Sequence, residues 1–151
     1  GNNTGLADAI GLALADRSAF GDVKGVARGL AGSWATALAR DEAIARVTAG
    51  VLGGRAAPFV FPFGPPVVRK VGLCSGAAGD LLEAAVAAGC DLFVTGELAE
   101  RAGELARELQ ITLVAAGHYA TEVFGPSRVA DELRRQFPAL SVHFVPVATP
   151  L

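Results

Sequence analysis

The sequence contains few of the residues that mark specialised protein classes. In 151 residues there are 2 cysteines, 2 histidines and no methionine, and Cys74 and Cys90 do not form a C-x-x-C pair. Sparse, separated cysteines argue against a disulfide framework and against a structural zinc knuckle. We therefore expect a reducing, cytoplasmic setting.

Charge of one sign and long apolar runs are also scarce. The formal net charge is −2 and charged residues make up 19% of the chain, so no basic field is available for a nucleic-acid backbone. Every apolar run is broken well before the roughly 20 residues that a membrane span requires. No basic segment followed by an apolar one stands at the start as an export signal. We expect neither nucleic acid nor a membrane as a partner.

What is present is the composition of a globular domain. Apolar residues make up 52% of the chain, and this length suits one ordinary hydrophobic core but is too short for two full-sized ones. We expect residues 1–151 to form a single α/β unit.

From residue 67 to residue 151, short apolar runs alternate with helical segments. The runs are VVRKVGLCS, CDLFVTG, ITLVAAG and SVHFVPV, and segments rich in Ala, Leu, Glu and Arg lie between them. This spacing predicts a β-α-β-α-β-α-β order. Strands that are apolar on both faces favour a three-layer α/β/α fold with a mostly parallel or mixed sheet, in which the last strand runs in either direction.

Residues 1–66 form a less regular, helix-rich lead-in. NNTGLADAIGLALAD predicts a helix capped by Asn3 or Thr4, and TALARDEAIARVTAGVLG predicts a second helix closed by Gly53 or Gly54. FGDVKGVARG is typical of a strand or a hairpin arm. The prolines of APFVFPFGPP indicate an edge strand or a loop.

Ligands of open α/β sheets bind beyond the carboxyl ends of the strands, so the loops after the expected strands are the candidate sites. The first loop, CSGAAGD, is a glycine-rich turn in which Ser75, Gly76 and Gly79 are candidates for binding an anion. It lacks the full dinucleotide or P-loop spacing, so a plain tight connection is the competing interpretation.

The second loop, TGELAER, places Thr95 and Glu97 on either side of a glycine. One interpretation is a helix start, with Thr95 as its cap and Glu97 in the first turn. The other is a pair of polar side chains that line a site.

The third loop carries GHYATE, with His118 and Glu122 four residues apart. On a helix these side chains lie on one face, and an imidazole nitrogen and a carboxylate oxygen are both ligands for divalent metals. A capped helix with one hydrogen-bonded histidine is the competing interpretation. His143 lies inside the last expected strand, so the sequence shows no third ligand.

Three stretches together resemble a known family. NNTGLADAIGL, VRKVGLCSGAAGDLLEAAVAAGCDLFVTGE and AAGHYATEVFGPSRVADELRRQFPALSVHFVPVATP are similar to the second half of the NIF-three-like dinuclear-metal-centre proteins, which are known as GTP cyclohydrolase 1 type 2 homologues. The resemblance extends over nearly the whole chain. Its most specific part is the order of a glycine-rich turn, T-G-E and G-H-x-x-T-E.

The resemblance implies a cytoplasmic α/β protein of two related lobes that assembles into a toroidal homohexamer. It also implies two divalent metal ions per full-length subunit, zinc, iron or manganese, in a cleft between the lobes. Within that cleft it matches His118 and Glu122 to metal ligands, and Thr95 and Glu97 to residues that line the site. Tyr119 stands where some similar proteins have histidine, so it is expected near the site and not as a ligand.

The sequence departs from the family pattern in its missing ligands. The family's adjacent histidine pair and its aspartate belong to the first lobe, and the aspartate lies just ahead of the segment that matches residues 1–3. The sequence thus resembles a family member cut after its first-lobe ligands, which fits the absence of methionine. Residues 29–69 are too few for the extra domain of long members. We expect the isolated segment to bind metal weakly and to be inactive.

The resemblance implies a metal-dependent hydrolase that acts on GTP or a related nucleotide, although no catalytic residue is identified. A non-enzymatic metal-binding scaffold or regulatory interaction protein is the alternative.

Overall fold

The computed structural model describes residues 1–54 and 56–147. Within these residues the chain forms one mixed sheet of six strands in the order β1-β2-β4-β5-β6-β3. The central strands β4, β5 and β6 are parallel to one another, whereas the remaining pairings are antiparallel. The strands are β1 Ser18–Val23, β2 Val26–Ala39, β3 Phe59–Pro62, β4 Val67–Cys74, β5 Leu92–Thr95 and β6 Thr112–Ala115.

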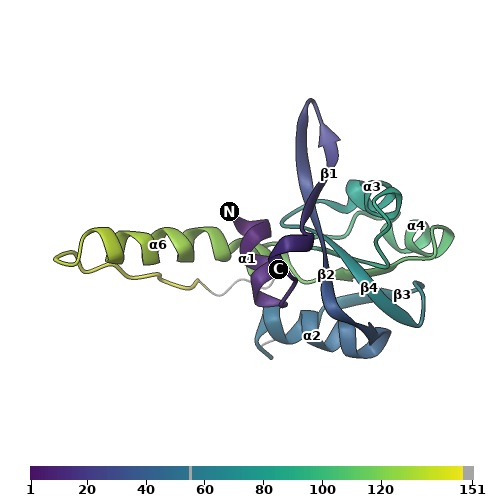
Figure 1. Ribbon diagram of the computed structural model, residues 1–151, viewed down its shortest axis with the longest axis horizontal. Helices are drawn as coiled ribbons and strands as arrows, with labels where there is room; N and C mark the ends of the chain where they lie inside the picture. The colour runs from purple at the N-terminus through teal and green to yellow at the C-terminus, as the bar shows by residue number, and fades with distance from the viewer. Residues whose placement is uncertain (55, 148–151) are drawn as a thin grey trace.

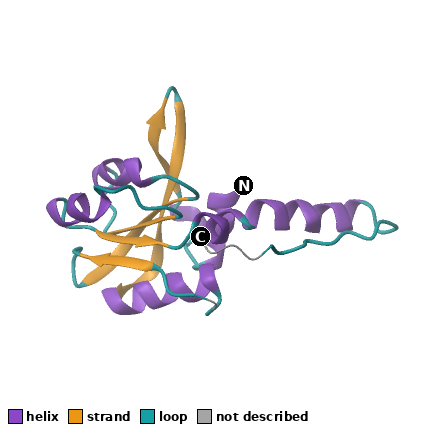
Figure 2. Cartoon of the chain, turned by 180° about the vertical axis from the view of Figure 1, so that it is seen from behind, coloured by secondary structure: helices purple, strands orange, loops and turns teal. Residues whose placement is uncertain are grey.

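Helices cover both faces of this sheet (Figures 1 and 2). Successive β5 residues alternate between two hydrophobic clusters, because Leu92 and Val94 join the cluster with α1 and α2, and Phe93 joins the one with α3 and α4. The three-layer α/β/α prediction is therefore confirmed. The helices are α1 Asn2–Ala9, α2 Arg40–Leu52, α3 Leu82–Ala87, α4 Ala102–Glu108, α5 His118–Glu122 and α6 Phe124–Gln136, with short 3-10 turns at Leu14–Asp16 and Gly79–Leu81.

The carboxyl ends of the parallel strands meet at one edge of the sheet. Cys74 pairs with Thr95, and Thr95 pairs with Ala115 on its other side. Each strand is followed by a loop, so the three candidate loops emerge side by side. Parallel strands buried on both faces read as continuous apolar runs, which is why the sequence located these three strands.

Part of the lead-in follows its prediction, but its two helices are shorter than the sequence pattern indicates. Helix α1 ends at Ala9, and residues 36–39 belong to strand β2 and not to the second helix. The β1–β2 pair is a hairpin that turns at Lys24 and Gly25, both with positive φ. Helix α2 ends at Gly53 in the left-handed conformation, and β3 is an edge strand.

The predicted cap of the first helix is wrong. Helix α1 has Gly1 at its N-cap position and no side-chain capping bond. Asn3 instead accepts a hydrogen bond from the backbone N–H of Ser75 at 2.9 Å. Its side chain therefore makes a tertiary contact and does not cap its own helix.

The predicted fourth strand, SVHFVPV, is also wrong. Residues 141–147 are extended but pair with no strand in the described part of the chain. Helix α6 carries the chain away from the sheet before this segment begins (Figure 1). We refer to residues 124–147, which comprise α6 and the segment after it, as the arm. Among the described helices, none is long and apolar enough to cross a membrane.

Candidate metal centre

Helix α5 places His118 and Glu122 on one face. The helix begins at His118, directly after Gly117 with φ of 99°. One helical turn then brings Nε2 of His118 to 3.4 Å from Oε2 of Glu122. The two side chains are 42% and 43% exposed, so both are partly open to solvent.

Glu97 orients the histidine from the neighbouring loop after β5. Its Oε1 lies 2.5 Å from Nδ1 of His118. This hydrogen bond raises the pKa of His118; desolvation opposes it, and the nearby Glu122 carboxylate adds to it. When the imidazole is neutral and its Nδ1–H donates to Glu97, its Nε2 lone pair is directed toward Glu122.

Gly76 lies directly beside the His118 and Glu122 side chains. It has φ of 68°, and a Cβ added there would lie 2.7 Å from Oε1 of Glu122 and 3.3 Å from Nε2 of His118. Any larger residue would fill the space beside the two ligand atoms, and the left-handed backbone also favours glycine. The glycine-rich loop after β4 therefore contributes empty volume to the site.

Two buried threonines hold Gly76 in place. Thr95, at the end of β5, donates its hydroxyl to the Gly76 carbonyl at 3.1 Å. The Gly76 N–H donates to Oγ1 of Thr121, on α5, at 3.0 Å. Both threonines are fully buried, so they fix the loop relative to His118 rather than face solvent. The sequence pattern did not single out Thr121, whose role depends on a loop more than 40 residues away.

Ser75 lies between the pair and the start of α1. Its hydroxyl donates to Oε1 of Glu122 at 3.4 Å. It also lines an open polar depression of about 270 Å³ together with the first residues of the chain, Gly1, Asn2, Asn3 and Thr4. The sequence pattern assigned Asn3 to a helix cap and did not single out Asn2, so neither asparagine was predicted as a neighbour of the site.

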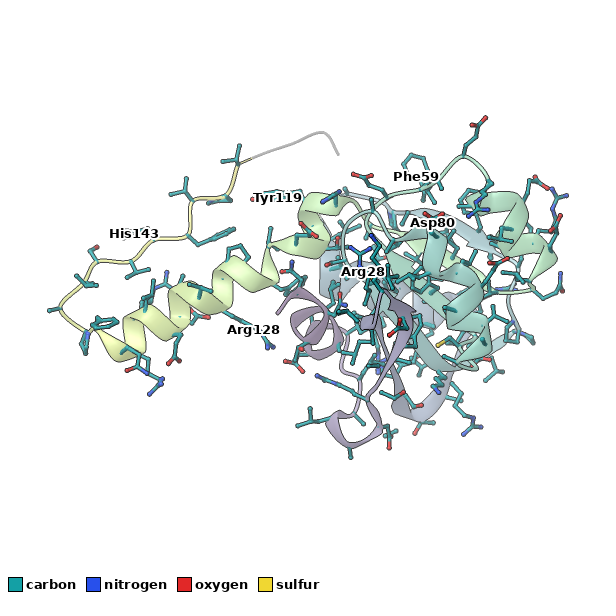
Figure 3. The ribbon with its side chains drawn as sticks, turned by 90° about the horizontal axis from the view of Figure 1, so that it is seen from above. Arg28, Phe59, Asp80, Tyr119, Arg128 and His143 are labelled. Carbon is teal, nitrogen blue, oxygen red and sulfur yellow. The ribbon has the colours of Figure 1, made fainter. Side chains whose placement is uncertain are left out.

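The other candidates lie farther from the ligand pair. Gly79 begins the 3-10 turn before α3 and packs near Ala99. The Tyr119 hydroxyl accepts a hydrogen bond from the Val147 N–H at 3.1 Å. His143 lies on the arm, where its Nε2 is 2.7 Å from the Ser141 hydroxyl (Figure 3).

The described residues contain no group of three or more His, Cys, Asp or Glu side chains arranged to hold a metal ion. The structure thus brings together two metal-type ligands, His118 and Glu122, and one orienting carboxylate, Glu97. It does not bring His143 to them.

Comparison with known proteins settles the family. The model of the Duf34/NIF3 family (NGG1p interacting factor 3) matches residues 1–150. The chain belongs to this family, as the sequence resemblance predicted.

Curated relatives are longer than this chain. A GTP cyclohydrolase 1 type 2 homolog of Neisseria meningitidis serogroup A is 33% identical over 145 residues, which are 95% of this chain and 55% of the relative. A protein of the same name from Treponema pallidum is 43% identical over 76 residues, covering 50% of this chain and 27% of the relative. The chain spans about half the length of the Neisseria relative.

Solved structures of similar proteins share the fold. The protein ybgI, described as of unknown function, superposes with a TM-score of 0.83 at 28% identity, over 100% of this chain and 57% of its own. The protein TTHA1606 of Thermus thermophilus gives a TM-score of 0.78 at 29% identity, over 100% and 56%. The predicted α/β fold of this family is confirmed.

Proposed function

We propose that His118 and Glu122 are two ligands of a divalent-metal site. The observation that carries the proposal is the 3.4 Å separation of Nε2 and Oε2. Two atoms that ligate one tetrahedral ion at about 2.1 Å stand about 3.4 Å apart. The pair therefore has the spacing that a shared ion requires without rearrangement of α5.

The surroundings of the pair fit a metal site. A histidine ligand commonly donates its second ring N–H to a carboxylate, which fixes its tautomer and orientation. Glu97 is such a partner for His118. Gly76 leaves free the space that a side chain would fill beside both ligand atoms.

Two protein ligands are too few to hold an ion tightly, since structural and catalytic sites use three or four. We propose that the remaining ligands come from the part of the relatives that this chain does not match. The family resemblance further suggests two ions per full-length subunit, with zinc, iron and manganese as the candidates, and a hexameric assembly.

For the whole protein we propose metal-dependent hydrolysis of GTP or a related nucleotide. The name shared by the curated relatives supports this substrate class. A bound divalent ion lowers the pKa of a coordinated water and polarises the substrate. In this chain His118 and Glu122 would hold the ion, and Glu97 would keep the imidazole oriented toward it. Ser75 donates a hydrogen bond to the Glu122 carboxylate, and it also lines the open polar depression formed with the first four residues of the chain, where we place polar groups of the substrate.

Titration of the chain with Mn²⁺ or Zn²⁺, followed by calorimetry, tests the site. We expect weak binding that His118→Ala and Glu122→Ala both remove. His143→Ala is the matched control, because it deletes the other histidine and should leave binding unchanged. An equal loss of metal binding in all three variants, or no loss of binding in any of them, would contradict the assignment. GTP ring opening by the unmodified chain alone would contradict the expectation that this chain carries only half of the metal site and is inactive by itself.

A non-enzymatic scaffold is the second candidate, and the arm favours it. Every residue from 131 to 140 is exposed, and the family description is that of an interacting factor. Nucleotide turnover by the full-length Neisseria relative separates the two functions. Turnover that is lost when the positions matching His118 and Glu122 are changed to alanine favours the enzyme, whereas an intact protein without turnover favours the scaffold.

A further inference from the structure

Arg28 is an exposed arginine at the start of β2 (Figure 3). Within residues 1–54 and 56–147 its guanidinium makes neither an ion pair nor a hydrogen bond. By contrast, Arg17 and Arg128 both pair with Asp8 of α1. A guanidinium carries five N–H donors in a planar fork that suits carboxylate and phosphate groups. Arg28 therefore keeps its full capacity to bind an anion.

The alternation of β2 places Arg28 on the sheet face that α1 and α2 cover. Leu30 packs against the hydrophobic cluster of that face, whereas Ala31 belongs to the cluster on the opposite face. A Cβ added at Gly29 would also point to the opposite face, where it would meet the ring of Phe20. Because successive side chains of a strand point to opposite faces, Arg28 stands on the same face as Leu30.

The register of the sheet sets Arg28 opposite Ser75. Strands β2 and β4 are antiparallel with Leu30 opposite Leu73, and two further residues along each chain lead to Arg28 and Ser75. The amide of Asn3 joins the two backbones here, since its Nδ2 donates to the Arg28 carbonyl at 2.7 Å and its Oδ1 accepts from the Ser75 N–H at 2.9 Å. The Asn3 side chain thus fixes the backbone of Arg28 relative to that of Ser75.

The open polar depression of about 270 Å³ lies at this junction, because Asn3 and Ser75 both line it. On one side these two residues connect it to Arg28. On the other side the Ser75 hydroxyl connects it to Glu122 of the ligand pair, 3.4 Å away. The depression therefore has a cation at one neighbour and the candidate metal ligands at another.

The thiol of Cys74, which directly precedes Ser75, is affected by the charges of both neighbours. Burial raises the pKa of this thiol, and the hydrogen bond with Asn3 and the positive charge of Arg28 oppose that rise. The negative charge of Glu122 adds to it. Arg28 and Glu122 are therefore both near the end of β4, in agreement with the register and the hydrogen bonds.

We propose that Arg28 binds the phosphate groups of a nucleotide substrate, whose chain of phosphates lies in the polar depression. This inference rests on the proposed function and adds to it the residue that holds the phosphates. The surroundings of His118 are otherwise acidic, because Glu97 and Glu122 flank it. A polyanion needs a positive charge beside these carboxylates, and a guanidinium binds phosphate oxygens through charge-assisted, often bidentate hydrogen bonds.

NMR titration of the chain with inorganic tripolyphosphate tests the phosphate subsite. We expect saturable shifts of the Arg28 Nε–H and Ser75 N–H signals, and a loss of affinity of about tenfold or more in Arg28→Gln. Lys24→Gln is the matched control, because it removes an exposed cation at the tip of the same hairpin and should leave the affinity unchanged. The spectra also show whether each variant is folded. No saturable shift at these two signals, or an equal loss in both variants, would overturn the proposal.

Titrations with GTP and with guanosine show whether the phosphates belong to a nucleotide. GTP should lose affinity in Arg28→Gln as tripolyphosphate does, whereas any binding of guanosine should be unaffected by the substitution. GTP binding that is insensitive to Arg28→Gln, or guanosine binding that falls equally, would contradict the assignment. All titrations contain EDTA, so their outcome does not depend on whether His118 and Glu122 bind metal.

Discussion

At the scale of single residues, the site depends on two glycines, Gly76 and Gly96, whose lack of a Cβ atom leaves room for neighbouring groups. Gly76 lacks the Cβ that would lie 2.7 Å from the Glu122 carboxylate, and Gly96 lacks one that would lie 2.7 Å from Cα of His118. The three loops approach one another so closely only because these positions carry no side chain. The glycines are visible in the sequence. The sequence could not show whether they serve only a tight turn or also leave space beside the His118 and Glu122 side chains.

The substitution Gly76→Ala should therefore cost both stability and metal binding. We expect a loss of about 1–3 kcal/mol for a non-glycine residue held at positive φ, together with displacement of Glu122. Gly89→Ala is a matched control, since Gly89 has φ of 77° and nothing within 4 Å of the added Cβ. Urea unfolding and metal titration of both variants separate backbone strain from the clash. Equal metal affinity in the two variants would show that Gly76 has no role at the site.

The substitution Glu97→Gln tests the orienting carboxylate. It keeps the size of the side chain but weakens the hydrogen bond to Nδ1 of His118. We expect metal affinity to fall by about 10- to 100-fold, as is typical when such a partner is removed. Nitrogen-15 NMR should also show more of the tautomer that is protonated on Nε2. Glu100→Gln changes a nearby exposed carboxylate and should alter neither the metal affinity nor the tautomer of His118. An unchanged tautomer in Glu97→Gln would refute the orienting role.

At the scale of elements, features that depend on neighbouring residues could be predicted from the sequence, whereas those that depend on tertiary contacts could not. Strands β4, β5 and β6 were predicted because burial on both faces leaves continuous apolar runs, and α2 because a glycine closes it. The segment SVHFVPV was predicted as a strand from the same alternation, and it is extended, but it has no partner strand among the described residues. Period and composition report the conformation of a segment and not the identity of its neighbour.

The same limit applies to the candidate site. The spacing of His118 and Glu122 is local, so the sequence predicted that they share a helix face. The contact between Glu97 and His118 joins the loop after β5 to α5, and the bond from Gly76 to Thr121 joins the loop after β4 to the same helix. These contacts follow from the order of the strands, which the sequence pattern alone did not fix.

The start of the arm is held to α1 by ion pairs of Asp8, and we expect their contribution to stability to depend on pH. Asp8 forms ion pairs with Arg17 and with Arg128 of α6. The hydrogen bond from Arg17, opposed by desolvation and reinforced by Arg128, lowers the pKa of Asp8 below its ordinary value of 3.8. A carboxylate with a lowered folded-state pKa stabilises the fold above the unfolded-state pKa, and that contribution is lost as the pH falls through the folded-state value.

The substitution Asp8→Asn should therefore reduce the free energy of unfolding at pH 7. The difference from the unmodified chain should shrink as the pH is lowered below about 4. Urea unfolding between pH 2 and pH 7 measures this dependence. Asp16→Asn, which changes an exposed aspartate of the neighbouring 3-10 turn, should leave the curve unchanged; a difference that persists undiminished at low pH would exclude the ion pairs as its cause.

At the scale of the whole molecule, the described chain consists of a packed α/β/α body and an arm that extends from it (Figure 1). The body contains both hydrophobic clusters, whereas the outer part of the arm contributes nothing to them. Among the described residues, the hydrophobic core therefore lies in the body, and the outer part of the arm is not part of it.

This division predicts unequal effects of apolar substitutions. Leu133→Gln on the arm should change the free energy of unfolding of the isolated chain by no more than about 0.5 kcal/mol, because it is a surface substitution. Leu113→Ala in the fully buried β6 should cost about 2–5 kcal/mol. Chemical unfolding of the two variants compares them directly. A large loss in Leu133→Gln would mean that the arm is already packed in the isolated chain.

The central claim is that His118 and Glu122 bind one divalent ion between them. Crystals of the chain grown with excess Mn²⁺ or Zn²⁺ and measured at the metal absorption edge test it most directly. We expect an anomalous peak about 2.0–2.2 Å from both Nε2 of His118 and an oxygen of Glu122, with Glu97 still bonded to Nδ1. A peak at His143 alone, or no peak at the Glu122 side of His118, would contradict the account.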